Sequence, residues 1–353
     1  MAAHSSSHLF DNTLPPRLLL PDISKYTRQY FTLTCNPFHQ EGEIASQAWF
    51  DNYGVLSGAQ RKQFFDRKPC LLVSLSYPEA DMEHLRPTMD FMLWLFAFDD
   101  MADLGEFKLE GLKRAVNITM NTLREPGGAQ PELKIAATLH NFFGRMRQNG
   151  SSQAIRHFIE ATDKYTQAIT QEMVHKDDGY VQTFEDYRKY RPDTSAVKLM
   201  LAMIEYAHEI NIPDEVLNDP VVSELALAGD EIISWANDIY SFPNEYARGH
   251  THNLVFITMW HNGLGLQDAV EHVNQLIEKR VRDYLEAKAT LRSFGSHLDG
   301  EVARYIQGIE YVIQACIDWS FVTTRYFGAD VAKVRETRVV HLIHPFKADD
   351  SSD

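Results

Sequence analysis

The sequence predicts an all-α protein, a bundle of about a dozen helices, and three observations support this fold class. Apolar residues recur at helical spacing over long stretches of the 353-residue chain. Residues that start and stop helices flank those stretches, and no run of alternating β-branched residues is long enough for a strand. Because no linker or repeat interrupts residues 14–335, we expect one helical domain there. It is expected to lie between a disordered N-terminus at 1–13 and a tail at 336–353 that is loosely ordered at its end.

Capping and breaking residues predict where the individual helices begin and end. A small polar residue before an apolar stretch can accept the first free amides of a helix, and a glycine after it can end the helix. The expected helices are one capped by Asp81 that runs through Asp103, one from about Pro131 to Asn149, a short one capped by Thr183, and long ones at 219–247, 266–293 and 298–327.

The composition excludes several classes of partner. With 34 basic and 49 acidic residues, the net charge of −15 argues against binding to nucleic acid or to an anionic membrane surface. Three widely spaced cysteines suggest neither a disulfide framework nor a metal-binding CxxC site. The N-terminus lacks the pattern of a signal peptide, and no apolar run reaches the length of a membrane span. We therefore expect a cytoplasmic protein.

A first acidic motif, FAFDDMAD, lies at 96–103. Asp99 and Asp103 are four residues apart and share one helix face, whereas Asp100 is rotated from them by about 100°. Toward the N-terminus the same face continues as an apolar stripe of Leu85, Met89, Met92 and Phe96. Carboxylates that extend a core-facing stripe are costly to bury unpaired, and Mg²⁺ bound by their oxygens would offset that cost. The alternative is an acidic helix end that faces solvent.

A second motif, NDIYSFPNE, lies at 237–245. Asn237, Ser241 and Glu245 are spaced i, i+4 and i+8, so they form a column about 12 Å long on one helix face. Amide, hydroxyl and carboxylate oxygens can bind Mg²⁺ and leave positions for phosphate oxygens. The alternative is an ordinary polar stripe on a solvated helix. Pro243 removes one helix hydrogen bond, so we expect Glu245 on a distorted last turn.

Basic residues outside these motifs could bind an anionic substrate. Arg191 lies in EDYRKYRPDTSA, and Arg325 and Tyr326 lie near the end of the helix expected at 298–327. A guanidinium matches phosphate bidentately and a phenol adds a hydrogen-bond donor, so the Arg–Tyr pair suits a diphosphate. Taken alone, Arg191 is better explained as a surface arginine, and Arg325 is as compatible with a solvated position beside core residues.

The combination of motifs resembles the class I terpene synthases, closest to the fungal and bacterial single-domain sesquiterpene cyclases. The resemblance extends from about Asn36 to Gly328. Asp99-Asp100-Met-Ala-Asp103 matches the aspartate-rich motif of the family, and Asn237, Ser241 and Glu245 match its pattern NDxxSxxxE. Arg191, which lies 46 residues before Asn237, matches the diphosphate-sensing arginine. Arg325-Tyr326 matches the C-terminal Arg–Tyr pair.

This resemblance implies the reaction. A helical bundle with a deep cavity would ionise a linear prenyl diphosphate, best matched by farnesyl diphosphate. It would cyclise the carbocation to a sesquiterpene and release diphosphate, as a carbon–oxygen lyase does. The family uses a cluster of three Mg²⁺ ions with substrate bound, for which Mn²⁺ can substitute, and a homodimer is a family-level expectation.

The resemblance also implies roles for individual residues. The expected metal ligands are Asp99, Asp103, Asn237, Ser241 and Glu245. Arg191, Arg325 and Tyr326 would bind the diphosphate. Asp100 would act without direct metal contact, paired with a mobile arginine. Phe96, Tyr165 and Trp319 would line the cation pocket, where each is equally compatible with plain core packing. Thr194 and Ser195 lie where the family breaks a helix and directs a carbonyl into the site.

Two positions depart from the family pattern. Asn244 stands where many relatives carry a lysine that contacts the diphosphate, and Pro243 affects the geometry of Glu245. We expect His250 and His252 to anchor a loop rather than to bind metal.

Two alternative functions stay open. A chain-elongating prenyltransferase would share the fold, but such enzymes usually carry two aspartate-rich motifs, whereas the second motif here is of the Asn/Ser/Glu type. A non-catalytic helical binding protein would show no turnover and no Mg²⁺-dependent release of diphosphate.

Overall fold

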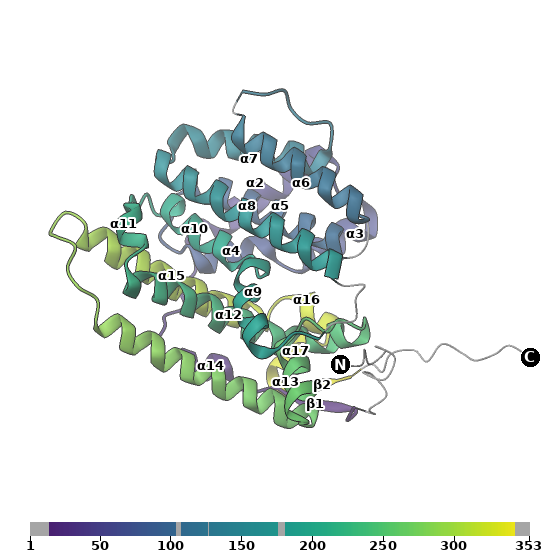
Figure 1. The fold of residues 1–353 in the computed structure, drawn as a ribbon. Helices are drawn as coiled ribbons and strands as arrows, with labels where there is room; N and C mark the ends of the chain where they lie inside the picture. The colour runs from purple at the N-terminus through teal and green to yellow at the C-terminus, as the bar shows by residue number, and fades with distance from the viewer. Residues whose placement is uncertain (1–13, 104–106, 126, 176–180, 343–353) are drawn as a thin grey trace, which may run out of the picture.

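The structure, a computed structural model, describes residues 14–103, 107–125, 127–175 and 181–342 (Figure 1). The expectations for residues 1–13 and for the end of the C-terminal tail therefore lie outside the described residues. Over the described ranges the all-α prediction is confirmed. No helix among them is long and apolar enough to cross a membrane.

The first part of the chain contains the expected helix that begins after Asp81 and ends at Asp103. Its first turn is capped by Asp81, whose carboxylate accepts from the backbone amide of His84. The elements are β1 (Arg17–Leu19), α1 (Ile23–Thr27), α2 (His39–Tyr53), α3 (Gly58–Asp66), α4 (Pro69–Ser76), α5 (Met82–Asp103), α6 (Leu109–Arg124), α7 (Lys134–Asn149) and α8 (Ser152–His175).

The second part of the chain contributes the longest helix and the C-terminal elements. These are α9 (Phe184–Thr194), α10 (Val197–Ala207), α11 (Asp214–Leu217), α12 (Pro220–Ala247), α13 (Leu254–Asn262), α14 (Leu266–Ala289), α15 (Asp299–Trp319), α16 (Thr324–Phe327), the 3-10 turn η3 (Gly328–Asp330), α17 (Val331–Thr337) and β2 (Val339–His341). As expected, Thr183 caps α9, where its side chain accepts from the amide of Asp186.

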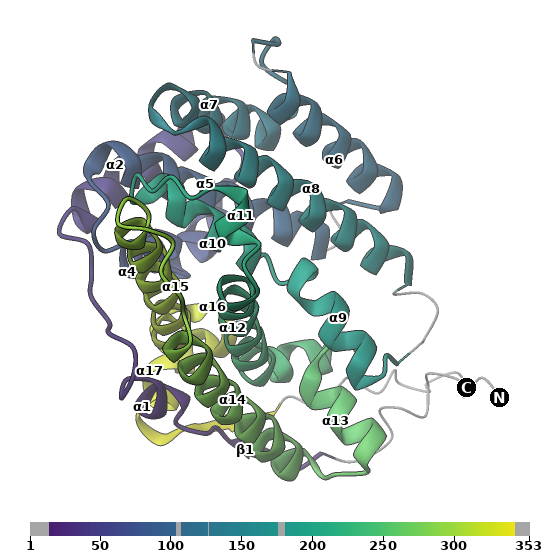
Figure 2. The same cartoon turned by 60° about the vertical axis from the view of Figure 1, so that its left-hand side comes forward.

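Helices α5 and α12 occupy central places in the bundle. Helix α5 packs against α2, α4 and α7, and α12 packs against α14 and α15. Figures 1 and 2 show α6, α7 and α8 together on one side of the molecule and α14 along another. The apolar stripe predicted for α5 is buried, with Leu85, Met89 and Met92 all at 0% exposure. Its burial orients the acidic end of the same helix.

The prediction of one continuous helix at 298–327 is wrong. Helix α15 ends at Trp319, and Arg325 lies on the separate short helix α16. The side chain of Thr323 accepts a hydrogen bond from the Arg325 amide and so caps α16. The same Oγ1 donates to the Arg67 carbonyl at 2.7 Å. These bonds turn the chain between the two helices, which repositions Arg325 relative to the predicted stripe.

Two smaller differences have local causes. Helix α12 continues through Pro243 to Ala247, because a proline removes only one helix hydrogen bond. Glu245 lies on the last turn of this helix. Strands β1 and β2 pair antiparallel, with Leu18 opposite Val340. They were not predicted, because three residues are too few to show an alternating pattern.

Candidate active site

A cavity of about 930 Å³ opens among α5, α8, α9, α10, α12, α15 and α16. Motifs that lie far apart in the sequence meet on its wall. The predicted site residues that line it are Phe96, Asp99, Arg191, Thr194, Ser195, Asn237, Glu245, Trp319, Arg325 and Tyr326. Asp100, Tyr165 and Ser241 are not part of this lining, and the side chain of Asp103 lies outside what the structure describes.

The acidic end of α5 is paired with two arginines. Arg325 lies with Nη2 3.0 Å from Asp99 Oδ2 and with Nη1 3.2 Å from Asp100 Oδ1. Arg67, which precedes α4, donates to the other oxygen of Asp100. Tyr165 on α8 donates its hydroxyl to Asp99 Oδ1 at 3.0 Å. Asp100 is thus paired with two arginines, and Asp99 is held from two directions.

The oxygen column of α12 faces the same region. Asn237 Oδ1 accepts from Arg191 at 3.0 Å, and its Nδ2 donates to the Tyr326 hydroxyl at 2.7 Å. One turn later, Ser241 Oγ is buried and has no hydrogen-bond partner among the described residues. Glu245 Oε2 accepts from the side-chain amide of Asn253 at 2.8 Å. Burial raises the pKa of the Glu245 carboxyl to about 7.

Arg191 is fixed by a residue that the sequence reasoning missed. The buried carboxylate of Asp238 accepts from Arg191 Nη2 at 2.9 Å, from the Tyr187 hydroxyl and from the Leu254 amide at 2.7 Å. Burial alone would lower the pKa of Arg191, but the charge of Asp238 outweighs it and the pKa rises. Asp238 is the Asp of the NDxxS pattern, directly after Asn237, and its place in that pattern is the sequence feature that could have identified it.

Aromatic rings form part of the cavity wall. The ring centres of Phe96 and Trp319 are 5.7 Å apart, and those of Trp319 and Tyr326 are 6.2 Å apart. Trp319 Nε1 donates to the Lys68 carbonyl at 2.9 Å, which fixes the orientation of the indole. The guanidinium carbon of Arg325 lies 5.1 Å from the centre of the Phe96 ring. The Arg325 guanidinium and these rings are therefore neighbours in the cavity wall.

The other singled-out positions have identifiable contacts. Asn244 donates to the Tyr326 carbonyl at 2.8 Å and so links α12 to α16. His252 Nδ1 lies 2.9 Å from Gln182 Oε1, and its Nε2 lies 3.3 Å from Thr194 Oγ1. Burial lowers the pKa of His252 to about 4, so the ring is neutral near pH 7. His252 thus anchors its loop, as expected.

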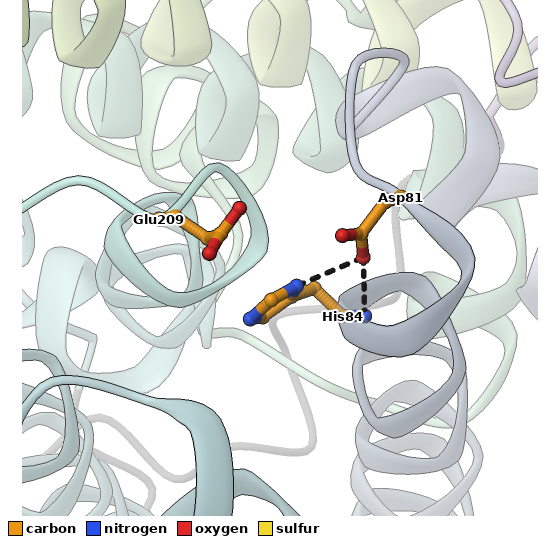
Figure 3. A group of neighbouring side chains, drawn as sticks. All are labelled: Asp81, His84 and Glu209. Atoms are coloured by element: carbon orange, nitrogen blue, oxygen red, sulfur yellow. Dashed lines mark hydrogen bonds and ion pairs between the residues drawn. The ribbon is translucent and has the colours of Figure 1, made fainter.

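A separate group of potential metal ligands lies away from the cavity lining, at the start of α5 (Figure 3). Asp81, His84 and Glu209 each offer a ligand atom within 4.8 Å of the others. Asp81 Oδ1 accepts from the backbone amide of His84 at 2.9 Å and lies 2.8 Å from its Nδ1. These bonds are those of a helix cap, which accounts for the position of Asp81.

The donor set in the cavity fits a divalent cation. Asp99, Asn237 and Glu245 line the same cavity and offer hard oxygen atoms, and the buried Ser241 hydroxyl lacks a partner in the described part of the chain. Mg²⁺ prefers such oxygen ligands together with substrate phosphate. This ligand set contains no cysteine thiolate. Burial raises the pKa of the nearby Cys316 thiol to about 12, so that thiol is protonated near pH 7.

Comparison with known proteins gives consistent matches. A family model described as terpene synthase family 2, C-terminal metal binding, matches residues 90–283. Sesquiterpene synthase Agr1 of Cyclocybe aegerita is 33% identical over 93% of both chains. Sesquiterpene synthase 3 of Postia placenta is 36% identical over 92% of this chain and 88% of its own. Among solved structures, a single-substitution variant of cucumene synthase superposes with a TM-score of 0.72 at 22% identity, covering 84% of this chain and 99% of that one.

Proposed function

The chain belongs to the terpene synthase family, and from this premise we propose that it is a Mg²⁺-dependent sesquiterpene cyclase acting on farnesyl diphosphate. Family membership makes it a lyase-type terpene cyclase with a divalent-metal site and a small prenyl substrate. The choice of a fifteen-carbon substrate is supported by the names of its relatives, which are sesquiterpene synthases.

One observation carries the proposal. The wall of one cavity combines oxygen donors and arginines with aromatic and aliphatic side chains. A prenyl diphosphate likewise combines a charged head with an apolar chain. A cavity with both kinds of side chain suits a substrate that must be held at the head while its chain folds in a water-poor space.

We assign metal binding to Asp99, Asp103, Asn237, Ser241 and Glu245, with three Mg²⁺ ions expected when substrate is bound. The bound ions would supply charge that stabilises the departing diphosphate. The chain itself holds the ligands in place. Tyr165 orients Asp99, Asn253 orients Glu245, and Arg191 with Tyr326 orients Asn237.

We assign the diphosphate to Arg191, Arg325 and Tyr326. All three line the cavity, and Arg191 and Arg325 already donate to amide or carboxylate oxygens that neighbour the expected head group. Guanidinium groups that pair with carboxylates can pair with phosphate oxygens in the same planar, bidentate manner. Their charge acts where negative charge develops as the carbon–oxygen bond breaks. Asp100, paired with Arg67 and Arg325, would set the position of Arg325 rather than touch metal.

We assign stabilisation of the carbocation to the faces of Phe96 and Trp319. An aromatic face is electron-rich and attracts a cation, more strongly where water is excluded. Trp319 is 3% exposed, and its ring is fixed by the bond to Lys68. Tyr165 is 1% exposed and bonds to Asp99, so its contribution would be to position that carboxylate.

The proposal is tested by incubating the purified protein with geranyl, farnesyl or geranylgeranyl diphosphate and Mg²⁺. Volatile products are then identified by gas chromatography and mass spectrometry. Cyclic fifteen-carbon products from farnesyl diphosphate support it. Longer prenyl diphosphates formed in the presence of isopentenyl diphosphate would instead identify a chain-elongating transferase, and no product from any substrate, with the protein folded, would favour a binding protein.

A further inference from the structure

The chain breaks its helical path between α9 and α10, at the cavity wall. Ala196 has φ of +61°, which is a left-handed conformation that residues with a side chain rarely adopt. The Leu199 amide, which would reach the Ser195 carbonyl in a continuous helix, donates to the Ala196 carbonyl at 3.1 Å instead. Ser195 and Ala196 both line the cavity. The strained break therefore needs an anchor that holds it.

Ser195 supplies contacts on both sides of the break. Its Oγ accepts from the amide of Val197, the first residue of α10, at 3.1 Å. The same hydroxyl donates to the carboxyl of Asp230, with 3.1 Å to Oδ1 and 3.4 Å to Oδ2. Asp230 lies on α12, two helical turns before Asn237 and on the same face. One hydroxyl thus links the break to the helix that carries the oxygen column.

Asp230 is 1% exposed, and among the described residues its hydrogen-bond partner is Ser195. Burial raises its pKa to about 8, although the charges of Lys198 and Arg191 act in the opposite direction. Lys198 is itself paired with Asp193 at 2.5 Å, and Arg191 with Asp238 at 2.9 Å. Asp230 is therefore a buried acid that accepts a hydrogen bond from Ser195 and forms no ion pair with Lys198 or Arg191.

We propose that Asp230 is a positioning residue for cyclisation. Through Ser195 it anchors the α9–α10 break against α12 and so fixes where the Ser195–Ala196 backbone meets the cavity. A carbonyl released from a helix ladder presents partial negative charge, which stabilises a nearby cation only while it is held in place. This inference rests on the proposed cyclase function, and it assigns to Asp230 an effect on the fate of the cation rather than on substrate binding.

The test compares Asp230→Leu, Asp230→Asn and Ser195→Ala with the wild type on farnesyl diphosphate. Asp230→Leu removes the acceptor, so we expect kcat to fall roughly 10-fold or more with KM little changed, because small misplacements of reacting geometry are costly. Its product mixture should also shift toward linear or less cyclised products. Asp230→Asn is close in shape to a neutral carboxyl and keeps an acceptor for Ser195, so it should retain most of the wild-type mixture. The double variant Ser195→Ala/Asp230→Leu should be no worse than Asp230→Leu alone.

Glu310→Leu is the matched control, because Glu310 is a buried acid on α15 that is not part of the cavity lining. It should lower Tm without altering the product mixture. A wild type that converts none of the prenyl diphosphates would refute the proposed function itself. An active wild type, with a folded Asp230→Leu variant that keeps its kcat and products, would refute the role of Asp230. If Asp230→Leu does not fold, an unchanged product mixture in Ser195→Ala refutes it equally.

Discussion

Arg325 bridges two neighbouring aspartates, with Nη2 3.0 Å from Asp99 and Nη1 3.2 Å from Asp100. The two ends of this contact lie far apart in the sequence, so it ties the C-terminal helix α16 to the end of α5. Both carboxylates are only partly exposed, with side-chain exposures of 30% and 21%. Arg325 thus offsets the mutual repulsion of the two carboxylates, which another cation would have to do in its absence.

Replacement of Arg325 by alanine should lower kcat/KM for farnesyl diphosphate by about 10²-fold or more, because a charge-assisted donor to the leaving group is lost. Arg325→Lys should restore only part of the activity, since an ammonium group cannot bind two oxygens in one plane. Steady-state measurement of diphosphate release checks both. Arg61→Ala is the control, because Arg61 pairs with Asp51 on the surface. Equal kcat/KM values for Arg325→Ala and wild type would contradict the assignment.

Loss of the Ser241 hydroxyl should weaken the response to Mg²⁺. Ser241→Ala is expected to raise the Mg²⁺ concentration for half-maximal activity by about 10-fold or more, as removal of groups at a metal site commonly does. Since Ser241 Oγ has no partner among the described residues, little stability should be lost. Ser223→Ala, on the exposed part of the same helix, should leave the Mg²⁺ titration unchanged. An unaltered titration in Ser241→Ala would remove Ser241 from the ligand set.

The indole of Trp319 should control products more than substrate binding. Trp319→Leu keeps an apolar side chain but removes the aromatic face, which contributes about 0.5–2 kcal/mol to a nearby cation. We expect kcat to fall about 10-fold and the share of linear products to rise, whereas Trp319→Phe should lie between the two. Trp260→Leu is the control, since Trp260 is 41% exposed on α13. Product analysis that finds the same mixture in Trp319→Leu and wild type would count against the role of the ring.

A histidine outside the cavity should make stability depend on pH. His157 lies between Glu205 Oε2 at 2.6 Å and Asp214 Oδ1 at 2.8 Å. Burial alone would lower the pKa of His157, but the bonds to these carboxylates outweigh it and raise the pKa above 6.5. The resulting stabilisation is complete below the unfolded pKa and is lost as the pH rises through the raised folded pKa.

The Tm difference between wild type and His157→Gln should therefore be largest near about pH 5.5, at roughly 2 °C or more, and should shrink at alkaline pH. Scanning calorimetry across this pH range measures it. His297→Gln, which changes an exposed histidine in the loop after α14, serves as the control. A difference that grows with rising pH would show that the linkage has the opposite sign.

Much of the fold followed from local patterns. Asp81 and Thr183 were identified as caps because a cap is specified by residues three positions apart, and the buried stripe on α5 follows from helical periodicity. The spacing that aligned Asn237, Ser241 and Glu245 is likewise a property of one helix. The separation of α16 from α15 was missed because the Thr323 cap depends on Arg67, which is remote in sequence.

The contacts that complete the site could not be read from sequence, because they join different helices. Tyr165 was expected to line the pocket, yet its hydroxyl donates a hydrogen bond to Asp99, because α8 brings Tyr165 to the acidic end of α5. Arg67 carried no motif, and only the packing of α4 places it beside Asp100. The bond between Ser195 and Asp230 also depends on how α9 and α12 meet. Each is a tertiary relation without a local periodic signal.

The central claim, Mg²⁺-dependent cyclisation of farnesyl diphosphate, is tested most directly by one measurement. Metal-free enzyme is mixed with farnesyl diphosphate, and diphosphate release and volatile products are followed before and after addition of Mg²⁺. We expect no release without the ion, and equal amounts of diphosphate and fifteen-carbon cyclic product with it. Release that proceeds unchanged in the presence of a chelator, or a folded enzyme that stays inactive with Mg²⁺, would contradict the claim.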